Sequence, residues 1–123
     1  MRILPKERYE DLKEIISNFQ GLYPVTNQEL ERMYSEVKHW ADANSRLAEN
    51  DDVVDGRTYG ILNLSERANA YSKKDGKWHN FHGDIYITVW TWSDTAKRFI
   101  CENAWGVTSA IHPKNVPLLI ELP

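Results

Sequence analysis

The sequence predicts an α+β protein in which two N-terminal helices pack on a mainly antiparallel sheet of four to five strands. Apolar residues recur at helical spacing between residues 5 and 49, and from residue 57 onward they alternate with a period of two. The dipeptide Asp75-Gly76 then supplies a hairpin turn between two strand-like runs. A chain of 123 residues has the length of one domain. We therefore expect a single domain over residues 1–123, with a helical hairpin at 5–49 and a sheet region at 57–122.

The first helix is expected from Pro5 to Phe19. Proline suits the first helical position, because the N–H that it lacks would have no intrahelical partner there. Apolar residues then follow at helical spacing, and Gly21 is expected to end the helix; the apolar stripe is Tyr9, Leu12, Ile15, Ile16 and Phe19.

The second helix has the clearest start signal in the chain. Thr26 and Glu29 have the spacing of a capping box, in which each side chain accepts a hydrogen bond from the other residue's backbone N–H. Val25 and Leu30 have the spacing of a hydrophobic staple across the same helix start. The apolar stripe that follows, which includes Leu47, predicts a helix that continues to about Ala48.

Strands are expected from Arg57 to Leu64 and from Ala68 to Ser72, with a turn at residues 73–77. The stretch from Lys77 to Trp92 then contains the longest alternating pattern of the sequence. Two sets of side chains alternate along it: Ile85, Ile87, Val89 and Thr91 on one face, and Tyr86, Thr88, Trp90 and Trp92 on the other. Both faces are largely apolar, so we expect a central strand that is covered on both sides.

The segment after Ser93 has two interpretations. It is either a hairpin turn into a strand at 97–102, or a helix at 94–105 that Gly106 ends. We favour the hairpin, because Phe99-Ile100-Cys101 extends a β-rich region. A terminal strand is expected from Leu118 to Leu122.

Composition excludes some classes of function and favours others. The net charge of −3 argues against a nonspecific nucleic-acid partner, which needs a basic surface to displace the counterions of phosphates. Cys101 is the only cysteine, so the chain forms no internal disulfide and no multi-thiolate zinc site. We see no signal peptide and no apolar run of about 20 residues, the length of a membrane helix. We therefore expect a cytoplasmic protein that binds no membrane and needs no cofactor.

One cluster could carry chemistry: His79, His82 and Asp84. Imidazole and carboxylate groups are ordinary ligands of zinc and ordinary acid–base catalysts. If residues 78–81 form a strand, however, His79 and His82 point to opposite faces and cannot share an ion without a turn. We therefore favour a strand end without chemistry, and we keep as an alternative a small ribonuclease or metal-dependent hydrolase that uses these three residues.

Two further features suggest protein binding. The acidic bend contains Asp51, Asp52 and Asp55, but Val53 and Leu62 occupy positions where a calcium loop needs oxygen ligands. Aromatic residues of the alternating stretch could serve as anchors for a partner, or they could be buried under the helices; they are Tyr86, Trp90 and Trp92.

These features together favour a small cytoplasmic protein-binding module of the inhibitor or immunity type. We expect it to neutralise a partner protein through an acidic and aromatic surface, and an acidic protein suits a basic partner. A homodimer, or a self-associating component of a larger assembly, is an alternative, because a second copy could cover the sheet face that the helices leave free.

Overall fold

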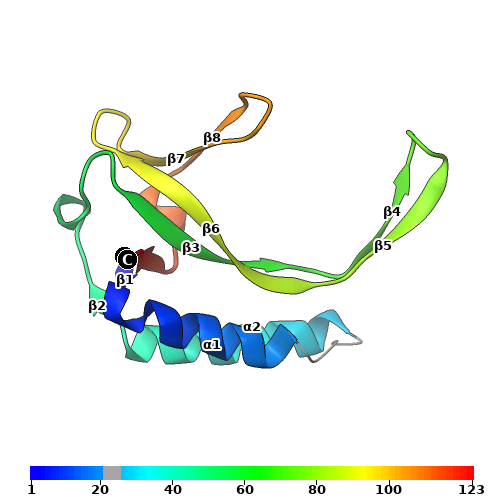
Figure 1. Ribbon diagram of the computed structural model, residues 1–123, viewed down its shortest axis with the longest axis horizontal. Coiled ribbons are helices and arrows are strands. Elements are labelled where there is room, and N and C mark those ends of the chain that lie inside the picture. The colour runs from blue at the N-terminus through cyan, green and yellow to red at the C-terminus, as the bar shows by residue number, and fades with distance from the viewer. Residues whose placement is uncertain (21–25) are drawn as a thin grey trace.

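A computed structural model describes residues 1–20 and 26–123 (Figure 1). Over these residues the chain forms two α-helices, a mixed sheet of seven strands and a separate two-stranded sheet. The α+β class is therefore confirmed, whereas the expected sheet of four to five strands is too small. No helix in the described ranges has the length and apolarity needed to cross a membrane. The expected helix end at Gly21 and the staple residue Val25 lie outside the described residues.

The elements follow one another in an order that begins and ends with a short strand. The helices are α1 (Tyr9–Gln20) and α2 (Asn27–Ala43), with short 3-10 helices η1 (Lys6–Arg8), η2 (Asn50–Asp52) and η3 (Pro113–Asn115). The strands of the large sheet are β1 (Arg2–Leu4), β2 (Arg46–Leu47), β3 (Thr58–Ser65), β6 (Asp84–Ser93), β7 (Arg98–Glu102), β8 (Thr108–Ile111) and β9 (Leu119–Glu121). The strands of the small sheet are β4 (Ala68–Ser72) and β5 (Lys77–Phe81).

Local sequence signals explain where α2 begins, but they do not explain where it ends. Thr26 is the N-cap, and its hydroxyl accepts a hydrogen bond from the backbone N–H of Glu29 at 3.1 Å. The helix ends at Ala43, earlier than the predicted end near Ala48. Leu47 lies instead in β2, paired with Arg2 of β1. The cause is tertiary: residues 46–47 pair with β1, which lies more than 40 residues earlier in the sequence, and this pairing replaces the last turn of the predicted helix.

The sheet has the strand order β2-β1-β9-β3-β6-β7-β8. It is mixed because β1 and β9 are parallel, with Ile3 opposite Leu119 and Leu4 opposite Ile120. The strand β1 precedes the helices, so the helices are not the first element of the chain. After Ser93 the chain forms the favoured hairpin, in which β7 pairs antiparallel with the end of β6.

Two hydrophobic cores lie on opposite faces of the sheet. The first packs the helices against one face and includes Leu62, Ile85 and Ile120. The second lies on the other face, where Trp92 and Phe99 contact each other with ring centroids 4.8 Å apart. The helices therefore cover the face of Ile85 and Ile87 rather than the aromatic face. Other segments of the chain pack with Trp92 in this core, among them Ala48 and Val53 before β3 and Val116 after β8, so this part of the sheet needs no partner as a cover.

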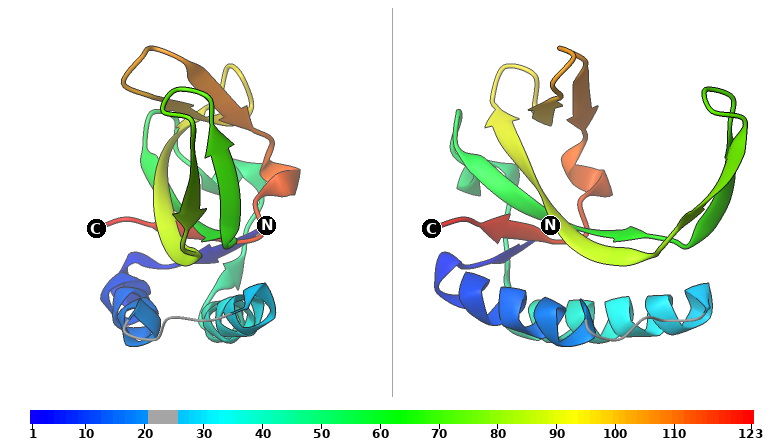
Figure 2. Two further views of the ribbon diagram at one scale, coloured as in Figure 1. Left: turned by 90° about the vertical axis from the view of Figure 1, so that its right-hand side faces the viewer. Right: turned by 45° about the vertical axis from the view of Figure 1, so that its right-hand side comes forward.

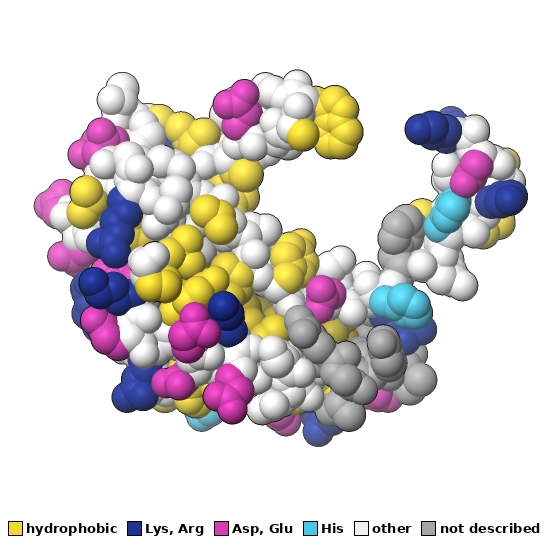
Figure 3. All heavy atoms as spheres, in the orientation of Figure 1, with side chains coloured by type: hydrophobic (Ala, Val, Ile, Leu, Met, Phe, Trp, Pro, Cys, Tyr) yellow, Lys and Arg dark blue, Asp and Glu magenta, His cyan; other side chains and the backbone are white. Residues whose placement is uncertain are grey.

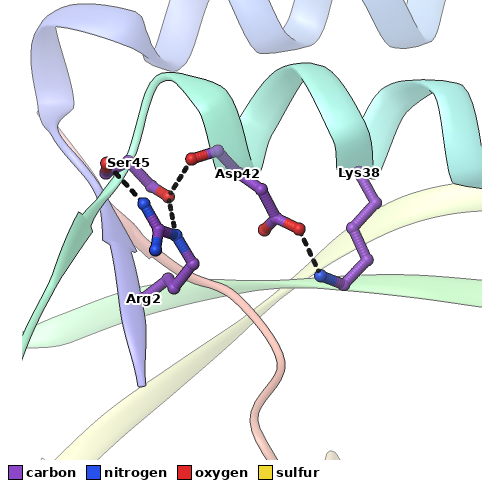
Figure 4. A network of polar contacts seen from close by, with 4 residues as sticks. All are labelled: Arg2, Lys38, Asp42 and Ser45. Atoms are coloured by element: carbon purple, nitrogen blue, oxygen red, sulfur yellow. Dashed lines mark hydrogen bonds and ion pairs between the residues drawn. The ribbon is translucent and has the colours of Figure 1, made fainter.

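A chain of polar contacts fixes the N-terminus against the end of α2 (Figure 4). The guanidinium of Arg2 donates from Nε to Ser45 Oγ at 2.8 Å and from Nη2 to the Ser45 carbonyl at 3.1 Å. Ser45 Oγ donates in turn to the Asp42 carbonyl, and the Asp42 carboxylate accepts from Lys38 Nζ at 2.8 Å. Burial raises the pKa of the nearby Tyr34 phenol; Lys38 opposes this rise and Asp42 adds to it. These contacts position β1 for its pairing with β9.

The strands β4 and β5 form a projecting hairpin, which we call the arm (residues 68–81). The arm continues the β3–β6 ribbon beyond two short breaks in the strands, at residues 66–67 and 82–83 (Figure 1). Its base is fixed to the start of α2, because the Asn27 amide accepts from the backbone N–H of Arg67 at 2.7 Å and donates to the Arg67 carbonyl at 3.2 Å. The direction of the arm is thus set by α2.

Gly83→Ala is expected to destabilise the protein by about 1–3 kcal/mol, the usual cost of adding volume to a packed region. A Cβ at this position would overlap Leu30 Cδ2 in the first core and would lie 3.0 Å from the Ser65 carbonyl oxygen. Urea unfolding followed by circular dichroism measures the change, with Asn69→Ala in the exposed arm as the control. Equal stability of Gly83→Ala and the wild type would contradict this close packing.

Candidate protein-binding site

The molecule has an open hollow between the arm and the β7–β8 hairpin (Figure 3). Figures 1 and 2 show the two helices as a layer on one side of the sheet and both hairpins projecting from the other side. The β3–β6 ribbon forms the floor of the hollow, the arm forms one wall, and the β7–β8 hairpin forms the opposite wall (Figure 1).

The floor presents the side chains of β3 and β6 that alternate with those under the helices. Ile85 and Ile87 pack in the helix-side core, so Tyr86, Thr88 and Trp90 face the hollow. The Thr88 hydroxyl accepts hydrogen bonds from Asn63 Nδ2 at 2.7 Å and from Trp90 Nε1 at 2.8 Å. These bonds engage the Thr88 hydroxyl and the Trp90 indole N–H, and Tyr86 remains 40% exposed beside them.

The arm carries an aromatic pair outside both cores. Tyr71 on β4 lies directly opposite Trp78 on β5, and their ring centroids are 5.6 Å apart. Trp78 is 71% exposed, and Tyr71 is also exposed. A two-stranded hairpin is only marginally stable in water without a packed face. Contact between these two rings therefore supports the pairing of the two arm strands.

The β7–β8 hairpin presents Trp105 at its tip, where its indole is 86% exposed. The side-chain oxygen of Asn103 accepts hydrogen bonds from the backbone N–H groups of Trp105 and Val107 at 2.9 and 3.0 Å. Gly106 adopts a positive φ of 75°, which closes the same turn. Hydrophobic side chains gather at this tip on the side of the hollow (Figure 3). The tip therefore holds a large indole in an ordered turn that exposes it to solvent.

Sequence reasoning did not select Trp105 as a site residue. The alternation of β7 ends before this residue, and the helix interpretation of 94–105 placed it at a helix end. The signal that could have found it is Asn103 with Gly106, because this spacing is typical of a tight turn. A tryptophan inside such a turn has few neighbours to bury it.

Two of the three aromatic residues predicted for partner binding reach the hollow. Tyr86 and Trp90 lie on its floor, and Trp90 is also partly packed on the second core. Trp92 does not reach the surface, because it is only 1% exposed and its Nε1 donates to Asp94 Oδ1 at 2.6 Å. The prediction of a binding role for Trp92 is therefore corrected to a structural one.

The acidic bend lies at the end of β3 opposite the arm, and its carboxylates help to build turns. Asp52 Oδ2 accepts from the backbone N–H of Glu49, and Asp55 Oδ1 accepts from that of Asp94, both at 2.8 Å. Asp51, Asp52 and Asp55 are all exposed. Of the aromatic residues predicted to form one surface with these acids, Trp90 and Trp92 lie near this end of the ribbon, whereas Tyr86 lies nearer the arm, opposite Asn63.

The structure gives the three candidate chemical residues different surroundings. His79 lies on β5, and its Nε2 is 2.7 Å from Asp75 Oδ2. His82 lies in the break between β5 and β6. Asp84 begins β6, and its Oδ1 accepts from the backbone N–H of Ile85 at 2.8 Å. Within the described ranges, no three side chains from the set His, Cys, Asp and Glu are grouped to hold a metal ion.

Charge is unevenly distributed between the arm and the rest of the chain. The arm contains three lysines, Lys73, Lys74 and Lys77, and one acid, Asp75, so it carries two net positive charges. The whole chain has a net charge of −3, so the remainder is acidic.

A scan against protein-family models and searches of the curated proteins and of the solved structures found no match to this chain.

Proposed function

We propose that this chain is a protein-binding module of the inhibitor or immunity type, which holds a partner protein in the hollow between the arm and the β7–β8 hairpin. The observation that carries the proposal is the exposed indole of Trp105 on a turn ordered by Asn103, across the hollow from an arm that exposes Trp78. Exposed tryptophans at fixed positions are the usual anchors of protein interfaces.

The energetics of the two hairpins support this role. Large aromatic side chains lose free energy when they stay in water, and each gains a few kcal/mol when it is fully buried. In this protein, Trp78 and Trp105 lie outside both cores, on hairpins that project from the sheet. A partner seated in the hollow would bury the indole of Trp105, and one that also wraps around the arm would cover Trp78 and support the arm. Binding and ordering of the arm would then reinforce each other.

The charges suggest the chemistry of the partner surface. The excess of lysines on the arm favours a partner with acidic groups at that wall, around an apolar protrusion that reaches the floor. The sequence predicted a basic partner surface, which would contact the acidic bend at the start of β3. A large partner could contact both this bend and the arm at the other end of the ribbon. Inhibition follows if the protrusion includes residues that the partner needs for its own activity. We place this action in the cytoplasm, and it needs no cofactor.

The hydrolase alternative has less support in the geometry. His79 is engaged with Asp75, and Asp84 with a backbone N–H, so neither is directed at a shared substrate position with His82. This alternative keeps a simple requirement: His79→Ala would have to abolish turnover without unfolding the chain.

Site-specific photocrosslinking in the source lysate tests the proposal. A photoreactive phenylalanine derivative replaces Trp105 in one variant and Trp78 in another, and a third variant carries it at the exposed Glu31 of α2 as the control. The expected result is covalent attachment of the same partner protein at both hairpin positions and none at Glu31. Attachment at Glu31 alone, or different proteins at the two hairpins, would overturn a shared binding hollow.

A further inference from the structure

The outer edge of β6 is open along most of its length. β7 pairs with β6 only at Thr91, Trp92 and Ser93, whereas β3 pairs with β6 from Asp84 to Thr91. Residues 84–90 therefore have a strand neighbour on one side only. This edge lies beside α1, across a groove of about 290 Å³ that is lined by Ile16, Ile85 and Ile87 with Tyr9, Lys13, Ser17 and Tyr86.

The direction of the backbone groups along this edge follows from the adjacent hydrogen bonds. The N–H of Trp92 donates to the Arg57 carbonyl at 3.0 Å, and the Trp92 carbonyl accepts from Gly56 at 2.9 Å, so both groups point to the β3 side. In an antiparallel pair this direction alternates from residue to residue. The backbone groups of Ile85, Ile87 and Val89 therefore point to the open edge.

One of these groups is already satisfied. Asp84 Oδ1 accepts from the N–H of Ile85 at 2.8 Å. No residue of the described ranges accepts from the N–H groups of Ile87 and Val89. Natural edge strands commonly carry lysine, proline or a bulge that prevents pairing with another chain. The run Ile85-Tyr86-Ile87-Thr88-Val89-Trp90 has none of these, and it contains no charge.

We propose that this edge binds a second copy of the chain, whose β6 pairs with it antiparallel about a two-fold axis at Ile87. In this register Ile85 of each copy faces Val89 of the other, and the two Ile87 residues face each other. The residues whose backbone N–H and C=O groups point to the open edge thus lie opposite one another in the two copies. This is the condition for hydrogen bonding across an antiparallel pair.

The ends of the open edge favour a second copy over an unrelated strand. Asp84 is the only charge in residues 84–90, and in this register it lies opposite Trp90, so no like charges face each other. The next pair would be Gly83 opposite Thr91, and Thr91 is already paired with Ile100 of β7. In the second copy β6 begins at Asp84, after the break at residues 82–83. Its paired part therefore ends opposite Trp90 of the first copy, one residue before that copy's own β7 begins to pair. The chain therefore matches its own open edge in length.

The side chains agree with this pairing. A two-fold axis perpendicular to the sheet keeps the helices of both copies on the same side, so Ile85, Ile87 and Val89 of the two copies form one apolar row above the grooves beside α1. Val89, which is 52% exposed, gains a cover. The two hollows open on the side of the sheet away from the helices. This inference is independent of the proposed inhibitor function.

Two substitutions at Val89 test the pairing. Val89→Pro removes a donor that points to the open edge, and Val89→Lys places a charge there; neither removes a β3 hydrogen bond. Val54→Lys, at an exposed valine outside the edge, is the matched control. Sedimentation is expected to give a dimer for the wild type and for Val54→Lys, and a monomer for both Val89 variants. A wild type that stays monomeric at every soluble concentration, or a dimer that survives Val89→Lys, would overturn the proposal.

Hydrogen exchange of the wild type gives a readout that does not depend on whether a variant folds. The backbone amides of Ile87 and Val89 are expected to become more protected as protein concentration rises, while those of the exposed arm stay unchanged. Protection of Ile87 and Val89 that is independent of concentration would exclude strand pairing between copies. Crosslinking from Trp105 that persists in monomeric Val89→Lys would separate this interface from the hollow.

Discussion

Trp92→Ala is expected to lower the free energy of unfolding by about 3–5 kcal/mol, the range for truncation of a fully buried tryptophan. Trp92 is among the largest fully buried side chains, and it packs on Phe99, which contacts Tyr59 in turn with centroids 6.1 Å apart. The substitution removes this contact and leaves Asp94 without its indole donor. Small domains have a total free energy of unfolding of about 5–15 kcal/mol, so this loss is a large share of the total, and the variant is expected to unfold at a lower temperature.

The matched control is Trp105→Ala, which removes the same side chain from an exposed turn and is expected to change stability by no more than about 0.5 kcal/mol. Trp92→Phe should lie between the two, because it keeps most of the ring volume and loses the bond to Asp94. Urea unfolding monitored by circular dichroism gives all three values. If Trp92→Ala and Trp105→Ala proved equally stable, the second core would not be organised around Trp92.

Trp105→Ala is expected to weaken the partner complex by at least about 2 kcal/mol, which is roughly a thirty-fold increase in Kd, the threshold typical of an interface anchor. The physical reason is the loss of a large apolar surface carried on a turn whose backbone is already ordered, so little backbone entropy is lost on binding. The Kd is measured by calorimetry with the protein that crosslinks to the hollow.

Leu47→Ala is the control for this second prediction. Leu47 is 73% exposed and lies on β2, at the edge of the sheet away from the two hairpins. Its truncation should leave the Kd unchanged. A loss of affinity in Leu47→Ala with none in Trp105→Ala would move the binding surface to the β2 edge and would contradict the role of the hollow.

Elements that depend on neighbouring residues could be predicted from the sequence. The start of α2 follows from the hydroxyl of Thr26 and the N–H of Glu29, three residues apart. The turn of the arm follows from Gly76, which adopts a positive φ of 70°. The alternation along β6 correctly separated the set of Ile85 from the set of Tyr86, because side chains on a strand point to opposite faces by geometry alone.

Which of those faces is covered, and by what, is decided only by the tertiary structure. The alternation places Tyr86, Trp90 and Trp92 on one face, but it does not show that the segments around Ala48 and Val116 bury Trp92 and leave Tyr86 exposed. The short strands β1 and β2 were missed for the same reason: they have two to three residues, and they pair with residues far away in the sequence. The strand β8 pairs with the neighbouring β7, with Glu102 opposite Thr108, and its residues carry no alternating apolar pattern that would have indicated it. Trp105 and Trp92 are chemically identical in the sequence; one is an exposed candidate anchor and the other a core residue because burial depends on distant neighbours.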